Sequence, residues 1–159
     1  TISIRAIKKL IIWSIMQYQQ NKNNYFIHIE KDEKVMDTLT RFCESEGIDN
    51  AKISGIGAVK NTEIGAYDTI KKEYIRKEFS DVLELVSYEG NITLKEGKPF
   101  VHAHVVLSDH DMKPYGGHLF ETTVAAVGEF FLKKFDGNAF RELNEDVGLP
   151  CICLNERFQ

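Results

Sequence analysis

The sequence predicts an α+β fold built on a largely antiparallel sheet. One segment of helical periodicity lies near the start of the chain, and short segments of strong β character follow it almost to the end. One helix followed by a run of strands is typical of this class. The composition of the 159 residues, 43% hydrophobic and 28% charged, is that of a folded protein rather than a disordered one.

The chain is predicted to divide into an N-terminal extension, residues 1–20, and a single domain, residues 21–159. Apolar side chains recur at helical spacing in the extension and predict an amphipathic helix: Ile4, Ile7, Leu10, Ile11, Ile15 and Tyr18. The polar residues 17–24 are expected to form a linker. Because no apolar run approaches the ~20 residues that cross a bilayer, no membrane span is expected.

The domain is expected to open with a strand at 25–31 and then a helix. Alternation in the strand places Phe26 and His28 on one face and two isoleucines on the other. Asp32 is predicted to cap the helix, with Glu33 in the first turn and Gly47 at the end. Its apolar face comprises Val35, Met36, Leu39, Phe42 and Cys43.

Strands are predicted for most of the remaining chain. The segments "AKISGIGAV" (51–59) and "TEIGAYD" (62–68) are expected to be separated by a turn at "KNT", and Gly55 and Gly57 to permit a close strand crossing or a bulge. Further strands are predicted at 73–79, 82–90, 91–97, 99–109 and 122–135, with a turn over "SDHDMKPYGG" (108–117). The tail, 138–154, has a mixed pattern.

Four of the five histidines fall between residues 102 and 118. His102 and His104 are two residues apart on a predicted strand, so their side chains point to the same face, with roots roughly 6.5–7 Å apart. The turn after this strand brings the chain back antiparallel and could place His118 beside them, where Gly116 and Gly117 let the backbones approach closely. His110 is expected to be exposed in the turn.

These histidines have two interpretations that spacing alone leaves open. Three histidines and one open position form the pattern of a catalytic or exchangeable zinc site. Alternatively, two histidines cover a polar strand face and the third bonds to a backbone carbonyl. The gap between His104 and His118 is not diagnostic of either.

Four segments, taken in order, resemble the PPC family (plants and prokaryotes conserved domain, also catalogued as domain of unknown function 296). They are "AKISGIGAV" (51–59), "FSDVLELVSYEGNI" (79–92), "HAHVVLSDHD" (102–111) and "GGHL" (116–119). The resemblance covers about residues 25–135, and residues 1–20 have no counterpart in it.

The resemblance implies an antiparallel sheet packed against helices and a homotrimeric assembly. It also implies a divalent metal, zinc, held by His102, His104 and His118 near a subunit boundary. The family carries a DNA-binding description that stems from plant members with a separate AT-hook. That hook is absent here, the net charge is −4, and the basic clusters are small: Arg5/Lys8/Lys9, Lys71/Lys72 and Lys133/Lys134.

The functional expectation is therefore a metal-binding protein, and whether it is an enzyme stays open. A zinc ion on three histidines lowers the pKa of water to roughly 7 and would suit hydrolase or lyase chemistry on a small molecule. Candidate carboxylates are Glu84, Glu89, Asp109 and Glu121, with Glu84 the candidate catalytic residue. The alternative is a DNA-binding, regulatory or scaffolding trimer without catalysis. The three cysteines lack a disulfide framework, which fits a cytoplasmic location.

Overall fold

The computed structural model describes residues 16–154, so most of the amphipathic helix expected in the extension lies outside the described residues, and its last apolar position, Tyr18, lies in a strand. The α+β class and the mainly antiparallel sheet are confirmed, with a single helix in the described part. In chain order the elements are β1 (Met16–Asn21), β2 (Asn24–Ile29), α2 (Val35–Glu46), β3 (Ala51–Asp68), β4 (Glu73–Phe79), β5 (Leu83–Lys95), β6 (Lys98–Ser108), β7 (Pro114–Lys134), β8 (Phe140–Asn144) and β9 (Leu149–Cys153).

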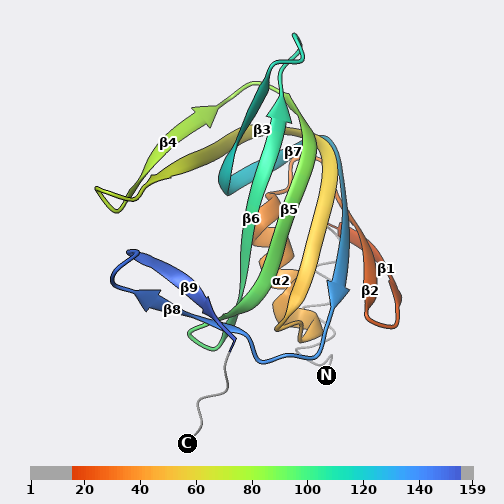
Figure 1. Ribbon diagram of the computed structural model, residues 1–159. Coiled ribbons are helices and arrows are strands. Elements are labelled where there is room, and N and C mark those ends of the chain that lie inside the picture. The colour runs from red at the N-terminus through yellow and green to blue at the C-terminus, as the bar shows by residue number, and fades with distance from the viewer. Residues whose placement is uncertain (1–15, 155–159) are drawn as a thin grey trace, which may run out of the picture.

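Four long strands close into a ring, because β3 pairs with β5 and β7 while β6 also pairs with β5 and β7 (Figure 1). The β1–β2 hairpin extends this sheet beyond the second half of β7. Two further hairpins project from the ring: β4 folds back on the second half of β3, and β8–β9 joins β5 through two parallel pairings. These two projections flank one face of β6 (Figure 1).

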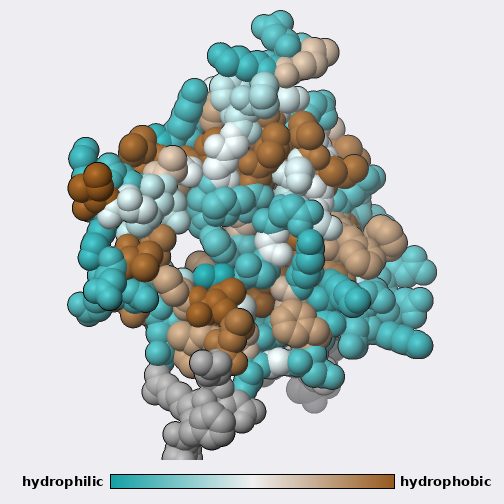
Figure 2. Space-filling model, viewed as in Figure 1, coloured by the Kyte–Doolittle hydropathy of each residue, from teal (hydrophilic) through white to brown (hydrophobic). Residues whose placement is uncertain are grey.

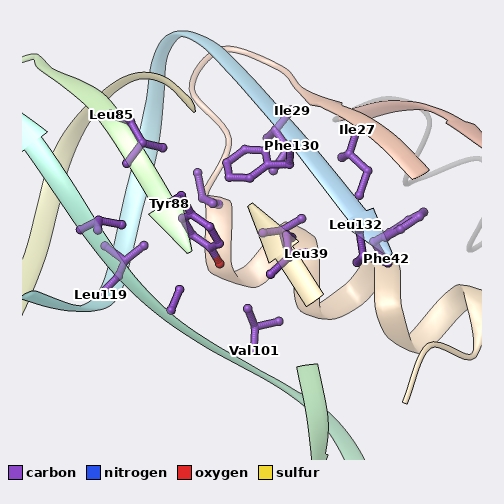
Figure 3. Close-up of a cluster of buried hydrophobic side chains, with 14 of the residues drawn as sticks. Ile27, Ile29, Leu39, Phe42, Leu85, Tyr88, Val101, Leu119, Phe130 and Leu132 are labelled. Atoms are coloured by element: carbon purple, nitrogen blue, oxygen red, sulfur yellow. The ribbon is translucent and has the colours of Figure 1, made fainter. Parts of the chain in front are cut away.

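The hydrophobic core lies between the inner face of the ring and α2, which packs against β6 and β7 (Figure 3). Strand residues alternate between core and solvent, as Val101, Ala103 and Val105 on β6 illustrate. The predicted apolar face of the helix is buried except for Met36, which is partly buried, and Leu39, Phe42 and Cys43 are inaccessible to solvent. No helix among residues 16–154 combines the length and the apolar character needed to cross a membrane.

The start of α2 differs from the prediction that Asp32 caps it. Asp32 adopts a left-handed backbone conformation, and Lys34 occupies the cap position without a side-chain hydrogen bond. Glu121 of β7 takes this role instead: its carboxylate accepts hydrogen bonds from the backbone N–H groups of Met36 (2.8 Å) and Asp37 (3.2 Å). A carboxylate at this position also complements the positive end of the helix dipole.

Replacing Glu121 with Ala is expected to lower the free energy of unfolding by about 0.5–2 kcal/mol, the range for the loss of a helix cap. Glu44→Ala, which changes an exposed glutamate on the same helix, serves as the control and should leave that free energy nearly unchanged. Urea unfolding at fixed protein concentration measures both changes. Equal stability of the two variants would show that Glu121 does not anchor the helix.

Several predicted element boundaries were wrong because the strands run longer than their sequence patterns indicate. Residues 17–24, expected as a linker, form β1 and a tight turn, with Met16 buried in the core. The "KNT" segment is not a turn, since β3 continues through Asn61, which has a positive φ, with a register shift. The predicted strands 82–90 and 91–97 are one strand, β5. Residues 114–117, expected in a turn, already belong to β7.

The expectation for Gly55 and Gly57 is confirmed. The pairing of β3 with β5 shifts register between these two residues, which is a β-bulge. A Cβ atom on Gly57 would collide with the carbonyl oxygen of Val127 on β7, and one on Gly55 would collide with the Phe130 ring. The glycines therefore let β3 bend while it pairs on both sides.

Candidate metal centre

The face of β6 that points away from the core carries His102 and His104, as the strand alternation predicts. Their neighbours Val101, Ala103 and Val105 point into the core. His118 of β7 pairs directly with His104 across the antiparallel ladder. The turn at residues 109–113 sets this register, because Pro114 of β7 pairs with Ser108 of β6.

The three imidazole rings form a compact triangle. Their centroids lie 5.3 Å apart for His102 and His104, 5.0 Å for His102 and His118, and 5.5 Å for His104 and His118. One nitrogen from each ring lies within 4.8 Å of the corresponding nitrogens of the other two. Small rotations of the side chains would bring three such nitrogens to ~2.0–2.1 Å from one shared point, which is the zinc–nitrogen bond length.

The environment keeps two of these rings neutral at physiological pH. Burial lowers the pKa of His102 to about 4, with the Arg141 guanidinium as the next cause. Burial likewise lowers the pKa of His118 to about 4, followed by the effects of His104 and Arg76. A neutral imidazole has one nitrogen lone pair available for a metal, so both rings are in the form that binds cations.

His118 also contains a buried polar atom, Nδ1, that has no hydrogen-bond partner among the described residues. The ring is held by Tyr74 of β4, at 4.9 Å between centroids, and by Phe120 of β7, at 4.8 Å. A buried nitrogen without a partner is unfavourable. A metal ion bound through Nδ1 would satisfy it, and the three neutral or exposed rings within reach of one another fit a metal ion.

Two walls enclose the histidine cluster. The β3–β4 hairpin contributes Tyr74 to one side, and the β8–β9 hairpin contributes Arg141, whose Nη2 lies 3.3 Å from His102 Nδ1, to the other. The tips of the two hairpins meet where the Tyr67 hydroxyl donates to the carbonyl oxygen of Val147 (2.7 Å). Figure 2 shows the surface hollowed between these hairpins.

The family model of the Plants and Prokaryotes Conserved (PCC) domain matches residues 16–136, which include all three histidines and the four strands of the ring. The chain belongs to this family. The family resemblance seen in the sequence motifs is therefore confirmed, and the matched segment ends before β8. No curated protein matches the chain.

Solved structures of similar proteins have the same fold. A plant- and prokaryote-conserved protein from Pyrococcus horikoshii is 36% identical, with a TM-score of 0.78, covering 91% of this chain and 96% of its own. A metal-containing protein from Archaeoglobus fulgidus is also 36% identical, with a TM-score of 0.77 and coverage of 86% and 96%. A candidate DNA-binding protein from Bacteroides thetaiotaomicron is 26% identical, with a TM-score of 0.85 and coverage of 88% and 98%.

The double glycine of this PCC domain is needed for close strand contact, as expected. A Cβ atom on Gly117 would lie 2.7 Å from the carbonyl oxygen of Gly65 on β3, and one on Gly116 would lie 3.1 Å from that of Val105 on β6. Gly65 pairs with His118, the next residue along β7. Small residues here therefore allow β7 to lie against both neighbouring strands while presenting His118.

One of the four candidate carboxylates, Glu89, lies beside the histidines, and the other three do not. Glu84 is exposed and pairs with Ser108, four residues beyond His104 and therefore about 13 Å along the strand. Glu89 pairs with His104 across the ladder, and its carboxylate forms an ion pair with Lys52 at 3.0 Å. Asp109 caps its own turn by accepting hydrogen bonds from Asp111, Lys113 and Tyr115, and Glu121 caps α2.

The other two histidines lie where the sequence placed them. His110 is exposed in the β6–β7 turn, and His28 is a partly exposed strand residue, 3.6 Å from the Glu30 carboxylate. Sequence reasoning missed Arg141 of β8, Tyr74 of β4 and Phe120 of β7, which contact the cluster. The one available signal was an arginine within the apolar segment "AFREL" of the tail.

Proposed function

We propose that this PCC-domain protein binds one divalent metal ion, zinc, through His102, His104 and His118. The observation that carries the proposal is the convergence of three ring nitrogens, one from each histidine, within 4.8 Å. The His118 ring also has a buried Nδ1 without a hydrogen-bond partner among the described residues. Three imidazoles suit zinc better than magnesium or calcium, which prefer oxygen ligands. The metal-containing relative from Archaeoglobus fulgidus, at 36% identity, adds support.

Three protein ligands leave an open position on a tetrahedral ion. An ion of this kind supplies Lewis-acid catalysis and makes water more acidic. This chain supplies the enclosing surfaces: Tyr74 and Phe120 pack on one side of the cluster, and Arg141 lies on the other. Glu84 lies further along the strand, and Asp109 and Glu121 are held by other hydrogen bonds. Glu89 lies opposite His104, but its carboxylate is paired with Lys52 at 3.0 Å. A small-molecule ligand of the open position is therefore a better supported expectation than a carboxylate-assisted reaction.

We also propose that three copies of the chain assemble. Apolar side chains are exposed together on the outer face of the sheet around a shallow groove: Phe26 (67% exposed), Ile56 (55%), Val86 (52%) and Phe131 (38%). A patch of this kind is typical of an interface, and a homotrimer is what the family resemblance implies. Light scattering should give the mass of three chains for the wild type and a smaller mass for Ile56→Glu.

Elemental analysis of protein purified without a histidine tag tests the metal proposal. The wild type is expected to contain about one zinc per chain, and the His102→Ala/His104→Ala double variant none. The substitution His28→Ala serves as the control because His28 lies on β2, outside the cluster. Absence of metal from the wild type, even after zinc is added back, would contradict the proposal.

DNA binding is the second candidate, favoured by the Bacteroides thetaiotaomicron relative, a candidate DNA-binding protein at 26% identity. The two lysine pairs, Lys71/Lys72 and Lys133/Lys134, give DNA binding little support, because one lysine of each pair already has a hydrogen-bond partner. The Lys134 ammonium donates to the carbonyl oxygen of Gly47 at the end of α2, and that of Lys72 donates to the carbonyl oxygen of Glu145. Fluorescence anisotropy with labelled duplex DNA at low salt tests this candidate, and binding that falls steeply with salt would support it.

A further inference from the structure

Arg141 is a buried cation fixed beside the histidine cluster. Only 9% of its surface is exposed, and its Nε donates a hydrogen bond to Thr93 Oγ1 at 3.0 Å. Nη1 donates to the carbonyl oxygen of Pro150 (3.0 Å), and Nη2 to Asn91 Oδ1 (2.8 Å) and His102 Nδ1 (3.3 Å). These four partners are neutral, and within residues 16–154 the guanidinium forms no ion pair. Its charge is therefore held in place without a counter-charge from those residues.

Metal binding by His102 would remove one of these hydrogen bonds. A guanidinium can only donate, so His102 Nδ1 must be the acceptor of the Arg141 N–H. If the metal takes Nδ1, that lone pair is used. If it takes the other ring nitrogen, Nδ1 of the neutral ring carries the proton and cannot accept. In either case an N–H of Arg141 loses its acceptor next to the ion.

The surroundings add a second positive group. The guanidinium of Arg76 lies 3.8 Å above the Phe120 ring, which itself packs on His118. Arg76 is paired with Glu63 at 2.9 Å, so its charge is partly balanced, whereas that of Arg141 is not. A divalent ion beside Arg141 therefore forms a strongly positive site with one open coordination position and one unused buried N–H donor.

We propose that the ligand of the open position is an oxyanion, the carboxylate or phosphate group of a small molecule, and that Arg141 binds it. The inference rests on the metal site proposed above. Arg141 belongs to the β8–β9 hairpin, which lies outside the segment matched by the family model. Because Arg141 binds the ligand in this proposal, the hairpin determines which ligand the histidine site accepts. An oxyanion would accept the N–H that metal binding leaves without a partner and would offset the charge of the ion.

Cobalt(II) replaces zinc in the test, because its visible spectrum reports ligands entering the open position. One cobalt per chain is first established, and the loaded protein is then titrated with acetate, with inorganic phosphate and with imidazole. Arg141→Gln is expected to weaken binding of the preferred oxyanion by about tenfold or more, as for the loss of a charge-assisted hydrogen bond. Binding of neutral imidazole should change by less than about twofold, since it needs no cation.

A second variant protects the test against unfolding of the hairpin. In Asn91→Asp a carboxylate of the same shape still accepts the Arg141 hydrogen bond but neutralises its charge, so oxyanion binding should again weaken while the hairpin stays in place. Arg41→Gln, which removes a helix cation paired with Asp37, is the control and should bind like the wild type. The preference for acetate or phosphate identifies which oxyanion the site takes.

Two results separate the possible failures. Loaded wild type that binds neither oxyanion, or binding unchanged by both Arg141→Gln and Asn91→Asp, would overturn the role of Arg141 and leave the metal site standing. A wild type that takes up no cobalt would overturn the metal site itself, and the inference with it.

Discussion

Substituting His104 with Ala is expected to abolish stoichiometric zinc binding while the protein stays folded. His104 is exposed on the outer face of β6, whereas its neighbours Ala103 and Val105 hold the strand in the core. Removing one of three ligands leaves two imidazoles, too few for a stable zinc site. Replacing an exposed strand side chain costs the fold little, within about 0.5 kcal/mol.

Two readouts check this prediction. Metal analysis after dialysis should fall from about one zinc per chain to nearly none. Thermal unfolding should show that zinc stabilises the wild type and not the variant, because a ligand stabilises only the state that binds it. His110→Ala, an exposed histidine in the neighbouring turn, is the matched control and should retain zinc. Full zinc occupancy in His104→Ala would contradict the proposed ligand set.

Replacing Phe42 with Ala is expected to produce the largest loss of stability, about 3–5 kcal/mol, typical of a buried aromatic residue. Phe42 is inaccessible to solvent and connects α2 to the β1–β2 hairpin. Its ring makes edge contacts with Tyr18 at 4.9 Å and with Tyr25 at 5.6 Å between centroids. The variant loses both contacts and leaves a cavity between the helix and the sheet.

Urea unfolding at one fixed protein concentration measures this loss, since an assembly of several chains would make the midpoint depend on concentration. Ile70→Ala is the control: this side chain is 91% exposed in the β3–β4 turn and should contribute almost nothing. A Phe42→Ala variant no less stable than the Ile70→Ala variant would contradict the placement of Phe42 in the core.

The parts of the site that depend on local geometry could be predicted from sequence. Alternation along a strand placed His102 and His104 on the same face, and the structure confirms it. The turn residues also predicted that the chain returns beside these histidines, but they did not predict the register in which β6 and β7 pair. Pairing of His104 with His118 depends on the turn ending at Lys113, whereas the pattern suggested a turn through Gly117.

The parts that depend on distant contacts could not be predicted. Glu121 caps α2 through Met36, a residue 85 positions away in the sequence. Asp32 is much closer in sequence, and nothing in its neighbourhood shows that it adopts a left-handed conformation and does not cap the helix. Arg141 reaches the histidines because β8 pairs with β5, Leu94 with Phe140 and Lys95 with Arg141. This junction has only two pairings, so the sequence pattern gives no sign of it. Contacts of this kind are set by the closed sheet rather than by periodicity.

Long strands account for most of the boundary errors. Bulges and register shifts, with a positive φ at Asn61, let β3 bend through 18 residues where the sequence suggested two strands separated by a turn at "KNT". Residues such as glycine and asparagine indicate where the backbone changes direction. They do not show whether the strand continues its hydrogen bonds to neighbouring strands past that point.

Anomalous diffraction at the zinc absorption edge, from crystals of the zinc-loaded wild type, tests the central claim most directly. The account predicts one strong peak per chain at about 2.0–2.1 Å from a nitrogen of each of His102, His104 and His118. A zinc peak elsewhere on the chain, or no peak at the three histidines in crystals that contain zinc, would contradict it.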